Sequence, residues 1–189
     1  MSGTGAVFLD RDGVLIEHVH HLHRPSDIAL IATARAAVAA LNQAEIPAIV
    51  ITNQSVVARG LCDEAELDAI HENVLALLRP AEIQAVYYCP HLPPEASHTP
   101  QPPYRVDCAC RKPAPGLLQQ AAQEHGLDLT RSLMIGDSTS DLEAGRRAGA
   151  QPALVQTGVG GRDARYAPSD HVFADVGDAV HWWIAERPR

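Results

Sequence analysis

The chain has 189 residues, of which 46% are hydrophobic, and it carries a formal net charge of -8 at pH 7. This length is sufficient for one domain with a sizeable core, and the negative charge argues against a broad nucleic-acid-binding surface, which requires clustered cations. Because the sequence shows neither an apolar span of membrane length nor a signal-peptide pattern, we expect a soluble, cytoplasmic protein that does not contact membranes. We also expect it to be a monomer.

Strand-like and helix-like segments alternate along the chain. Short apolar runs predict strands at 7–9, 48–51, 83–88, 133–135, 153–155 and, more weakly, 172–173. Hydrophobic spacing and terminal signals predict helices at 33–44, 63–79, 115–126, 140–148 and through 182–183. Thr33 is predicted to cap the first helix, and Asp63 with Glu66 resembles a capping box. This alternation predicts an α/β fold with a Rossmann-like parallel sheet and helices on both faces.

Three of the predicted strands end in reactive polar residues. Asp10 and Asp12 follow the first strand, the run 52–55 follows the second, and Asp137 follows the fourth. Turn and helix-capping chemistry would explain each segment taken alone. Because the carboxyl ends of parallel strands share one edge of a sheet, however, we expect these groups to converge. Two acids as close as Asp10 and Asp12 also require a bound cation or a shared proton.

These motifs resemble those of the haloacid dehalogenase (HAD)-like phosphatases. The matching segments, in order, are Asp10-x-Asp12-Gly13, Thr52 after an apolar strand, Lys112 before a helix, and Gly136-Asp137-x-x-x-Asp141. More narrowly, the runs 52–55, 58–60, 87–91 and 108–113 resemble the D-glycero-D-manno-heptose 1,7-bisphosphate 7-phosphatase family, whose relatives include histidinol phosphatases. The resemblance spans nearly the whole chain and implies one HAD-like phosphatase domain over residues 1–189. No insertion is large enough for a separate cap domain.

The resemblance implies a Mg²⁺-dependent phosphomonoesterase that works through an aspartyl-phosphate. Asp10 would be the nucleophile and Asp12 the general acid and base. Thr52 and Lys112 would bind the transferring phosphoryl group. Mg²⁺ would be held by the carboxylates of Asp10 and Asp137 and by the backbone carbonyl of Asp12, which are the oxygen ligands that this ion prefers.

A second constellation consists of Cys89, His91, Cys108 and Cys110. Three thiolates and one imidazole form the closed ligand set of a structural Zn²⁺ site, and the resemblance implies the same. Free thiols or a disulfide are the alternatives, and a cytoplasmic setting disfavours the disulfide. The intervening stretch is rich in proline and cannot form a helix, so zinc would staple a loop at 89–110. Arg111 and Lys112 follow this loop directly, so we expect the loop to position them.

The resemblance also implies the substrate. We expect the enzyme to remove the 7-phosphate of the heptose bisphosphate. If the chain is a different phosphatase, the alternative substrate is histidinol phosphate or another small sugar phosphate. If it is not an enzyme, the alternative is a catalytically silent binding module organised by zinc. The candidate substrate contacts are His18, His20, His21, Thr52, Asn53, Gln54, Ser55, Arg111 and Lys112. The chain departs from the family at two places. It lacks a Gly-Tyr pair near His20 and His21, and it has Ser138 where the family has lysine.

Three further features of the sequence are Asp141, Cys62 and the histidine-rich segment 18–23. Asp141 would orient Lys112 or a metal-bound water, or would serve only as an acid in the first turn of a helix. Cys62 lies outside the proposed zinc set and is expected to pack as a small apolar residue. The histidine-rich segment 18–23 has no neighbouring cysteines or carboxylate pair, so we expect it to contact substrate rather than a metal.

Overall fold

The computed structural model of the chain describes residues 3–96 and 102–187. Within them, six strands form one sheet in the order β3-β2-β1-β4-β5-β6, and every neighbouring pair is parallel. The strands are β1 (Val7–Leu9), β2 (Ala48–Asn53), β3 (Ala85–Cys89), β4 (Leu133–Gly136), β5 (Gln151–Val155) and β6 (Val172–Phe173). The predicted parallel α/β sheet is therefore confirmed.

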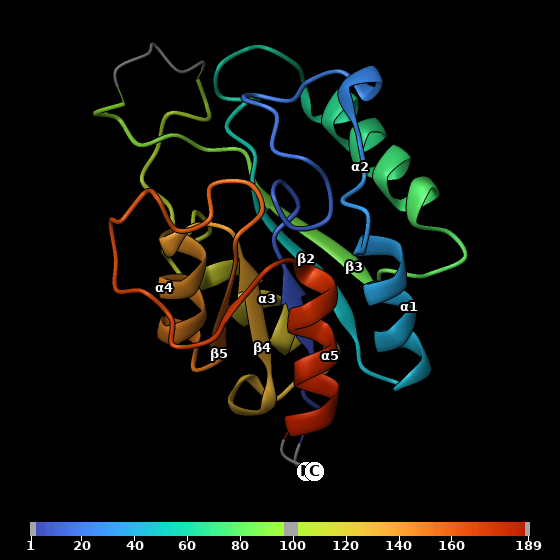
Figure 1. Cartoon of the computed structure of the whole chain (residues 1–189). Helices are drawn as coiled ribbons and strands as arrows, with labels where there is room; N and C mark the ends of the chain where they lie inside the picture. Colours follow the sequence, from blue (N-terminus) through green and yellow to red (C-terminus); the bar gives the residue numbers. More distant parts are fainter. Residues whose placement is uncertain (1–2, 97–101, 188–189) are drawn as a thin grey trace.

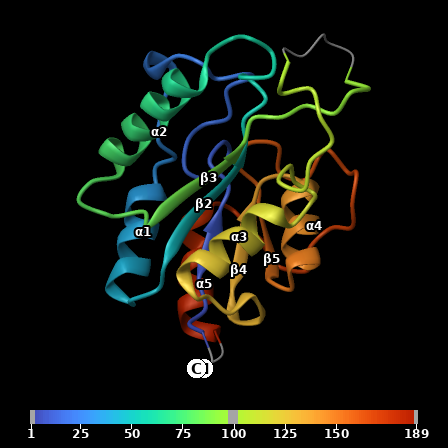
Figure 2. The ribbon, with the colours of Figure 1, turned by 180° about the vertical axis from the view of Figure 1, so that it is seen from behind.

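Helices cover both faces of this sheet. They are α1 (Ala34–Gln43), α2 (Glu64–Leu78), α3 (Gly116–His125), α4 (Thr139–Ala148) and α5 (Val176–Glu186), with short 3-10 turns at Pro25–Asp27 and Leu129–Arg131. α1, α2 and α5 lie on one face, and α3 and α4 lie on the other (Figures 1 and 2). Each face has its own apolar core, one around Val38, Ile70 and Val180 and the other around Leu118 and Ala144. In the described part of the chain no separate cap covers the sheet.

The starts of the helices follow the predicted signals except at Pro115 and Thr33. The capping box of α2 is confirmed, because the backbone N–H of Asp63 donates to Glu66 at 2.9 Å and that of Glu66 donates to Asp63 at 2.8 Å. Pro115 lies at the residue before α3 rather than in its first turn. Gly126 ends α3 with a φ of 65°, a left-handed conformation that glycine adopts without strain.

The predicted helix cap at Thr33 is wrong. Thr33 precedes α1 with a φ of -90° and a ψ of -10°, and its side chain makes no capping hydrogen bond. Its hydroxyl oxygen is buried without a hydrogen-bond partner in the described part of the chain. The residue packs against the start of α5 instead, where a Cβ on Gly177 would lie 2.9 Å from the Cβ of Thr33. Close packing of the two helices therefore replaces capping at this position.

Strand order places the polar segments together. β1 lies between β2 and β4, with Leu9 paired to Val50 and Ile135, so the segments that follow these three strands leave the sheet side by side. They leave at the upper end of the sheet in Figure 1. Across the described residues, no helix is both long and apolar enough to cross a membrane.

Candidate functional site

A pocket of about 390 Å³ opens at the carboxyl ends of β1, β2 and β4. Its volume is in the range of small-molecule sites. Its walls bring together all the residues that the sequence proposed for catalysis and substrate binding, namely Asp10, Asp12, His18, His20, His21, Thr52, Asn53, Gln54, Ser55, Arg111, Lys112 and Asp137. The convergence that strand order predicts is therefore present in the fold.

Lys112 is fixed in this pocket at both its backbone and its tip. Its Nζ atom donates to the carbonyl oxygen of Ile51 at 2.8 Å and lies 2.9 Å from Oδ1 of Asp10 and 2.7 Å from Oδ1 of Asp141. The side-chain amide of Asn53 holds the backbone N–H and carbonyl of Lys112 at 3.0 and 3.1 Å. Burial alone would lower the pKa of the ammonium group, but the two carboxylates outweigh burial and raise it. Lys112 is therefore a buried, permanently charged group.

Asp141 serves two purposes at once. One carboxylate oxygen binds Lys112, and the other accepts from the backbone N–H of Ser138 at 3.0 Å and from its hydroxyl at 2.6 Å. The bond from the backbone N–H of Ser138 belongs to the capping box of α4. Burial raises the pKa of Asp141, and the charge of Lys112 opposes that shift. Asp141 both orients Lys112 and starts the helix.

Three carboxylates form a compact acidic group. Asp10, Asp137 and Asp141 each offer an oxygen within 4.8 Å of the others. Burial, and then the charges of Asp10 and Asp141, raise the pKa of Asp137 to about 8, while the charge of Lys112 acts in the opposite direction. A Cβ on Gly13 or on Gly158 would lie 2.2 Å from Oδ2 of Asp137, so only glycine allows the backbone this close. A cluster of hard oxygen donors of this kind fits Mg²⁺.

The carboxylate of Asp12 contacts Arg11 and Gln54 and does not join the three clustered carboxylates. Nε and Nη2 of Arg11 each donate to it at 3.1 Å, and Nε2 of Gln54 donates to it at 2.8 Å. Nε2 of Gln54 also donates to Oγ1 of Thr52 at 2.8 Å. Asp12 is thus held by a planar guanidinium and an amide, beside the phosphoryl-binding candidate Thr52 rather than among the three clustered acids.

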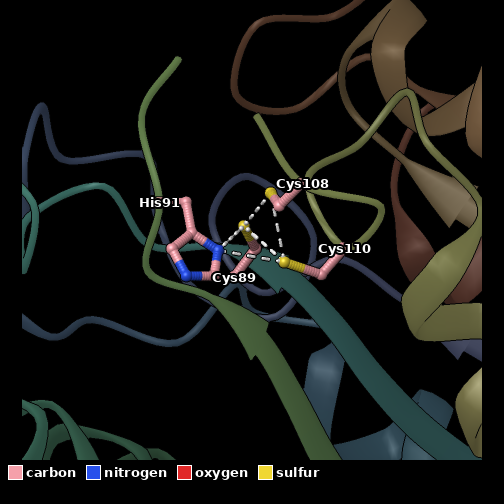
Figure 3. Close-up of side chains that lie close together, drawn as sticks. All are labelled: Cys89, His91, Cys108 and Cys110. Carbon is pink, nitrogen blue, oxygen red and sulfur yellow. Dashed lines mark hydrogen bonds between the residues drawn. The ribbon is translucent and has the colours of Figure 1, made fainter. Parts of the chain in front are cut away.

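The four proposed zinc ligands meet in one cluster (Figure 3). The sulfur atoms of Cys89, Cys108 and Cys110 lie 3.0 to 3.6 Å from one another, and Nδ1 of His91 lies 3.2 Å from Cys110 and 3.5 Å from Cys89. Tetrahedral Zn²⁺ with Zn–S bonds of about 2.3 Å separates two sulfurs by about 3.8 Å, so these donors fit the ion after a small expansion. Hydrogen bonding with Cys89, and to a smaller extent with Cys108, lowers the pKa of Cys110 to about 5 against the effect of burial.

The zinc-ligand cluster is joined to the pocket. Nη1 of Arg111 donates to the carbonyl oxygen of His91 at 3.1 Å, and Arg111 directly precedes Lys112. Cys62 lies apart from the cluster and packs with Val56 and Leu67. Arg111 therefore links the cluster of cysteines and His91 to Lys112 in the pocket.

The histidine-rich segment faces the same pocket. Nδ1 of His18 lies 4.0 Å from Oδ2 of Asp137, and the rings of His20 and His21 pack with centroids 3.9 Å apart. Two groups in the described part of the chain could hold a metal ion, and these histidines belong to neither.

The pocket residues that sequence reasoning missed include two arginines, Arg59 and Arg165. Arg59 lies in the loop after β2, and Arg165 lies in the loop after β5. The backbone N–H of Arg165 donates to Oγ1 of Thr139 at 3.1 Å, which anchors this loop on α4. Arg59 has a sequence signal, because it follows the polar run 52–55 closely. The loop of Arg165 has no pattern that places it.

Comparisons with known proteins identify similar chains. The HAD-hydrolase-like family model matches residues 109–179. A D-glycero-D-manno-heptose-1,7-bisphosphate 7-phosphatase of Thermosynechococcus vestitus is 39% identical over 186 residues, which cover 94% of each chain. A D-glycero-beta-D-manno-heptose-1,7-bisphosphate 7-phosphatase of Pseudomonas aeruginosa is 38% identical, over 82% of this chain and 83% of the relative.

A solved structure has the same architecture. The crystal structure of D,D-heptose 1,7-bisphosphate phosphatase from B. bronchiseptica, complexed with magnesium and phosphate, matches with a TM-score of 0.83 and 32% identity. The match covers 96% of this chain and 99% of that one. Sequence and structure comparisons therefore agree over nearly the full length.

Proposed function

This chain belongs to the HAD-like hydrolases, as a member of the D-glycero-D-manno-heptose-1,7-bisphosphate 7-phosphatase family, and from that premise we propose that it removes the 7-phosphate of D-glycero-D-manno-heptose 1,7-bisphosphate. As a member of this family the chain is a phosphatase. The observation that carries the proposal is the position of Lys112, whose buried ammonium group lies between Asp10 and Asp141. A fixed cation beside a candidate nucleophile is the arrangement that phosphoryl transfer requires.

In the proposed reaction, Asp10 attacks the phosphorus atom of the 7-phosphate while Asp12 protonates the departing C7 oxygen. The bond from phosphorus to the sugar oxygen breaks as the bond from Asp10 forms, which leaves an aspartyl-phosphate. A water molecule then attacks this phosphorus and gives its proton to Asp12, so inorganic phosphate leaves and Asp10 is restored. Oδ1 of Asp10 is held by Lys112 at 2.9 Å and by the backbone N–H of Arg11 at 2.8 Å, which orients the carboxylate for attack.

Thr52 and Lys112 are assigned to the transferring phosphoryl group. Oγ1 of Thr52 accepts a hydrogen bond from Gln54, so the hydroxyl hydrogen of Thr52 is available to donate to a phosphoryl oxygen. Lys112 adds positive charge in a buried setting, where electrostatic interactions are stronger than in water. The two groups therefore stabilise the charge that develops on the phosphoryl oxygens.

We assign Mg²⁺ to the carboxylates of Asp10 and Asp137 and to the backbone carbonyl of Asp12. The clustered carboxylates and the closeness of Gly13 and Gly158 to Asp137 support this assignment. When bound, the ion supplies positive charge that offsets the repulsion between the acids and attracts the phosphate dianion.

Structural Zn²⁺ is assigned to Cys89, His91, Cys108 and Cys110. The four donors converge, and they leave no open position for a substrate. The loop 89–110 includes residues 97–101, which lie outside the described part of the chain. The role that we propose for the ion is to hold the described ends of this loop, and with them Arg111 and Lys112, against the pocket.

The rest of the pocket favours a substrate with a second phosphate. Arg59, Arg111 and Arg165 line it, and none of the three forms an ion pair within the described residues. Burial lowers the pKa of Arg111, the nearby thiols of Cys89 and Cys108 oppose that shift, and the charge of Arg59 adds to it. A second phosphate would neutralise this positive charge. Contacts to the sugar are assigned to His18, His20, His21 and Ser55, while Asn53 and Gln54 act through Lys112 and Asp12.

The proposed function is tested by measuring release of inorganic phosphate from the heptose bisphosphate and from histidinol phosphate. We expect kcat/KM for the bisphosphate to be higher by about a hundredfold or more, because histidinol phosphate leaves the arginines unpaired. Chelation of Mg²⁺ should abolish turnover, and added Mg²⁺ should restore it. Equal rates for the two substrates would contradict the heptose assignment. No turnover of any phosphomonoester would support a binding module instead.

A further inference from the structure

Arg11 is fully buried, and one of its nitrogen atoms has no hydrogen-bond partner among the described residues. The side chain is 2% exposed, and its Nε and Nη2 atoms bind Asp12 and Gln54. Nη1 is buried without a partner in the described part of the chain. A buried N–H group without an acceptor is unfavourable by about 1–3 kcal/mol, and more when the group is charged. An acceptor is therefore expected next to Nη1.

His71 provides the complementary unpartnered atom. It lies in α2 on the face that packs against the sheet, and it is 6% exposed. Its Nε2 atom is also buried, with no hydrogen-bond partner in residues 3–96 and 102–187. Its ring packs against Tyr88 with centroids 5.2 Å apart. Burial, and then the charge of Arg11, lower the pKa of His71 to about 3. The ring is therefore neutral near pH 7, and one of its nitrogen atoms can accept a hydrogen bond.

Arg11 and His71 line the same small cavity. Its volume is about 10 Å³, and its other walls are Val50, Val74, Leu75 and Val86. This volume is close to that needed for one water molecule, which also needs at least two polar partners. A water molecule here would accept from Nη1 of Arg11 and donate to Nε2 of His71, so that both unpartnered atoms would be satisfied.

We propose that a buried water molecule joins His71 to Arg11, and that His71 thereby acts as a positioning residue for Asp12. The inference rests on the proposed function, because it takes Asp12 to be the general acid. The contacts run from His71 through the water to the guanidinium of Arg11 and from there to the carboxylate of Asp12. His71 touches no substrate. It acts by holding the guanidinium plane in one orientation, and a well-oriented acid transfers its proton more efficiently.

The test compares His71→Leu with His71→Gln on two substrates that differ in their leaving groups. An alkoxide, as in a sugar phosphate, needs protonation by Asp12, whereas the p-nitrophenolate of p-nitrophenyl phosphate leaves without it. The quantity compared is kcat/KM, because it reports only the steps up to departure of the leaving group. We expect His71→Leu to lower kcat/KM for the sugar phosphate about tenfold more than for p-nitrophenyl phosphate. His71→Gln should restore most of the loss, because its amide can accept from the same water.

The control variant is Val74→Ala, which enlarges the cavity but keeps both polar atoms. It should lower the melting temperature and leave the ratio of the two kcat/KM values unchanged. An equal loss on both substrates in His71→Leu, or a change in the ratio as large in Val74→Ala, would overturn the inference. A crystal structure without a water molecule between Arg11 and His71 would also overturn it. Wild-type protein that hydrolyses neither substrate would instead overturn the proposed function.

Discussion

Asp141 contacts Lys112 through one carboxylate oxygen, at 2.7 Å, and caps α4 through the other. One buried side chain thus fixes both the start of a helix and the cation proposed to face the transferring phosphate. The two interpretations that the sequence left open for Asp141 are therefore compatible, since each oxygen of the carboxylate serves one of them.

Asp141→Asn should separate the two roles. The amide oxygen can still cap α4, but the ion pair with the buried Lys112 is lost. We expect the free energy of unfolding to fall by about 3 kcal/mol, because the lysine keeps only Asp10 as a charged partner. We also expect kcat to fall about a hundredfold, because Lys112 is no longer held toward the phosphoryl group. Chemical denaturation and steady-state kinetics measure the two effects.

Glu143→Gln is the matched control in the same helix. Glu143 lies 2.8 Å from Arg147 in an exposed pair. Loss of this ion pair should lower the free energy of unfolding by less than about 0.5 kcal/mol and leave kcat unchanged. Equal effects of the two substitutions would show that Asp141 acts only as an acid in the first turn of α4.

Loss of one proposed zinc ligand should lower turnover, although that residue is not proposed to contact the substrate. We expect Cys108→Ala to lose bound zinc and to lower turnover, because the loop that ends in Arg111 and Lys112 is then no longer held. Metal analysis and steady-state kinetics measure both quantities. Cys62→Ala, outside the cluster, should keep its zinc and its kinetics. A folded, zinc-free Cys108→Ala protein with wild-type kinetics would disprove this coupling.

His71 should make stability depend on pH. Its pKa is about 3 in the folded protein against 6.5 for an ordinary histidine. Between these values the unfolded chain binds a proton that the folded chain does not, so stability falls as the pH falls from 6.5 toward 3. The slope from this one group is at most about 1.4 kcal/mol per pH unit. The difference between wild type and His71→Gln in the free energy of unfolding, measured by denaturant titration at a series of pH values, isolates this contribution.

Arg165 should discriminate between one and two phosphates. We expect Arg165→Gln to lower kcat/KM for the heptose bisphosphate about tenfold and to leave that for the heptose 7-phosphate unchanged, because only the bisphosphate presents a second anion. Arg131→Gln is the control, since Arg131 precedes β4 at the opposite edge of the sheet. An equal loss on both substrates would remove the role in selectivity.

Much of the fold and the convergence of the site could be predicted because they depend on local patterns. Alternating apolar runs determine the parallel sheet, and strand order then places Asp10, Thr52 and Asp137 at one edge. Contacts set by packing between distant segments could not be predicted. The position of Thr33 against α5 depends on how two helices meet, not on its sequence neighbours.

The network behind the pocket was also beyond sequence reasoning. An arginine between two aspartates is expected at a surface, yet Arg11 is fully buried because Asp12 and Gln54 satisfy most of its donors. His71 gave only a weak signal, as a lone histidine on the apolar face of a predicted helix. Its unpartnered nitrogen becomes visible only when the helix is placed against the sheet.

The most direct measurement identifies the phosphorylated side chain. Asp12→Asn protein can be mixed with Mg²⁺ and p-nitrophenyl phosphate, which phosphorylates Asp10 without an acid while the later hydrolysis lacks its base. After an acid quench, peptide masses locate the phosphoryl group. We expect one phosphoryl group on Asp10, and none anywhere in the Asp10→Asn, Asp12→Asn double variant. An unmodified Asp10 in Asp12→Asn protein that still turns over this substrate would contradict it.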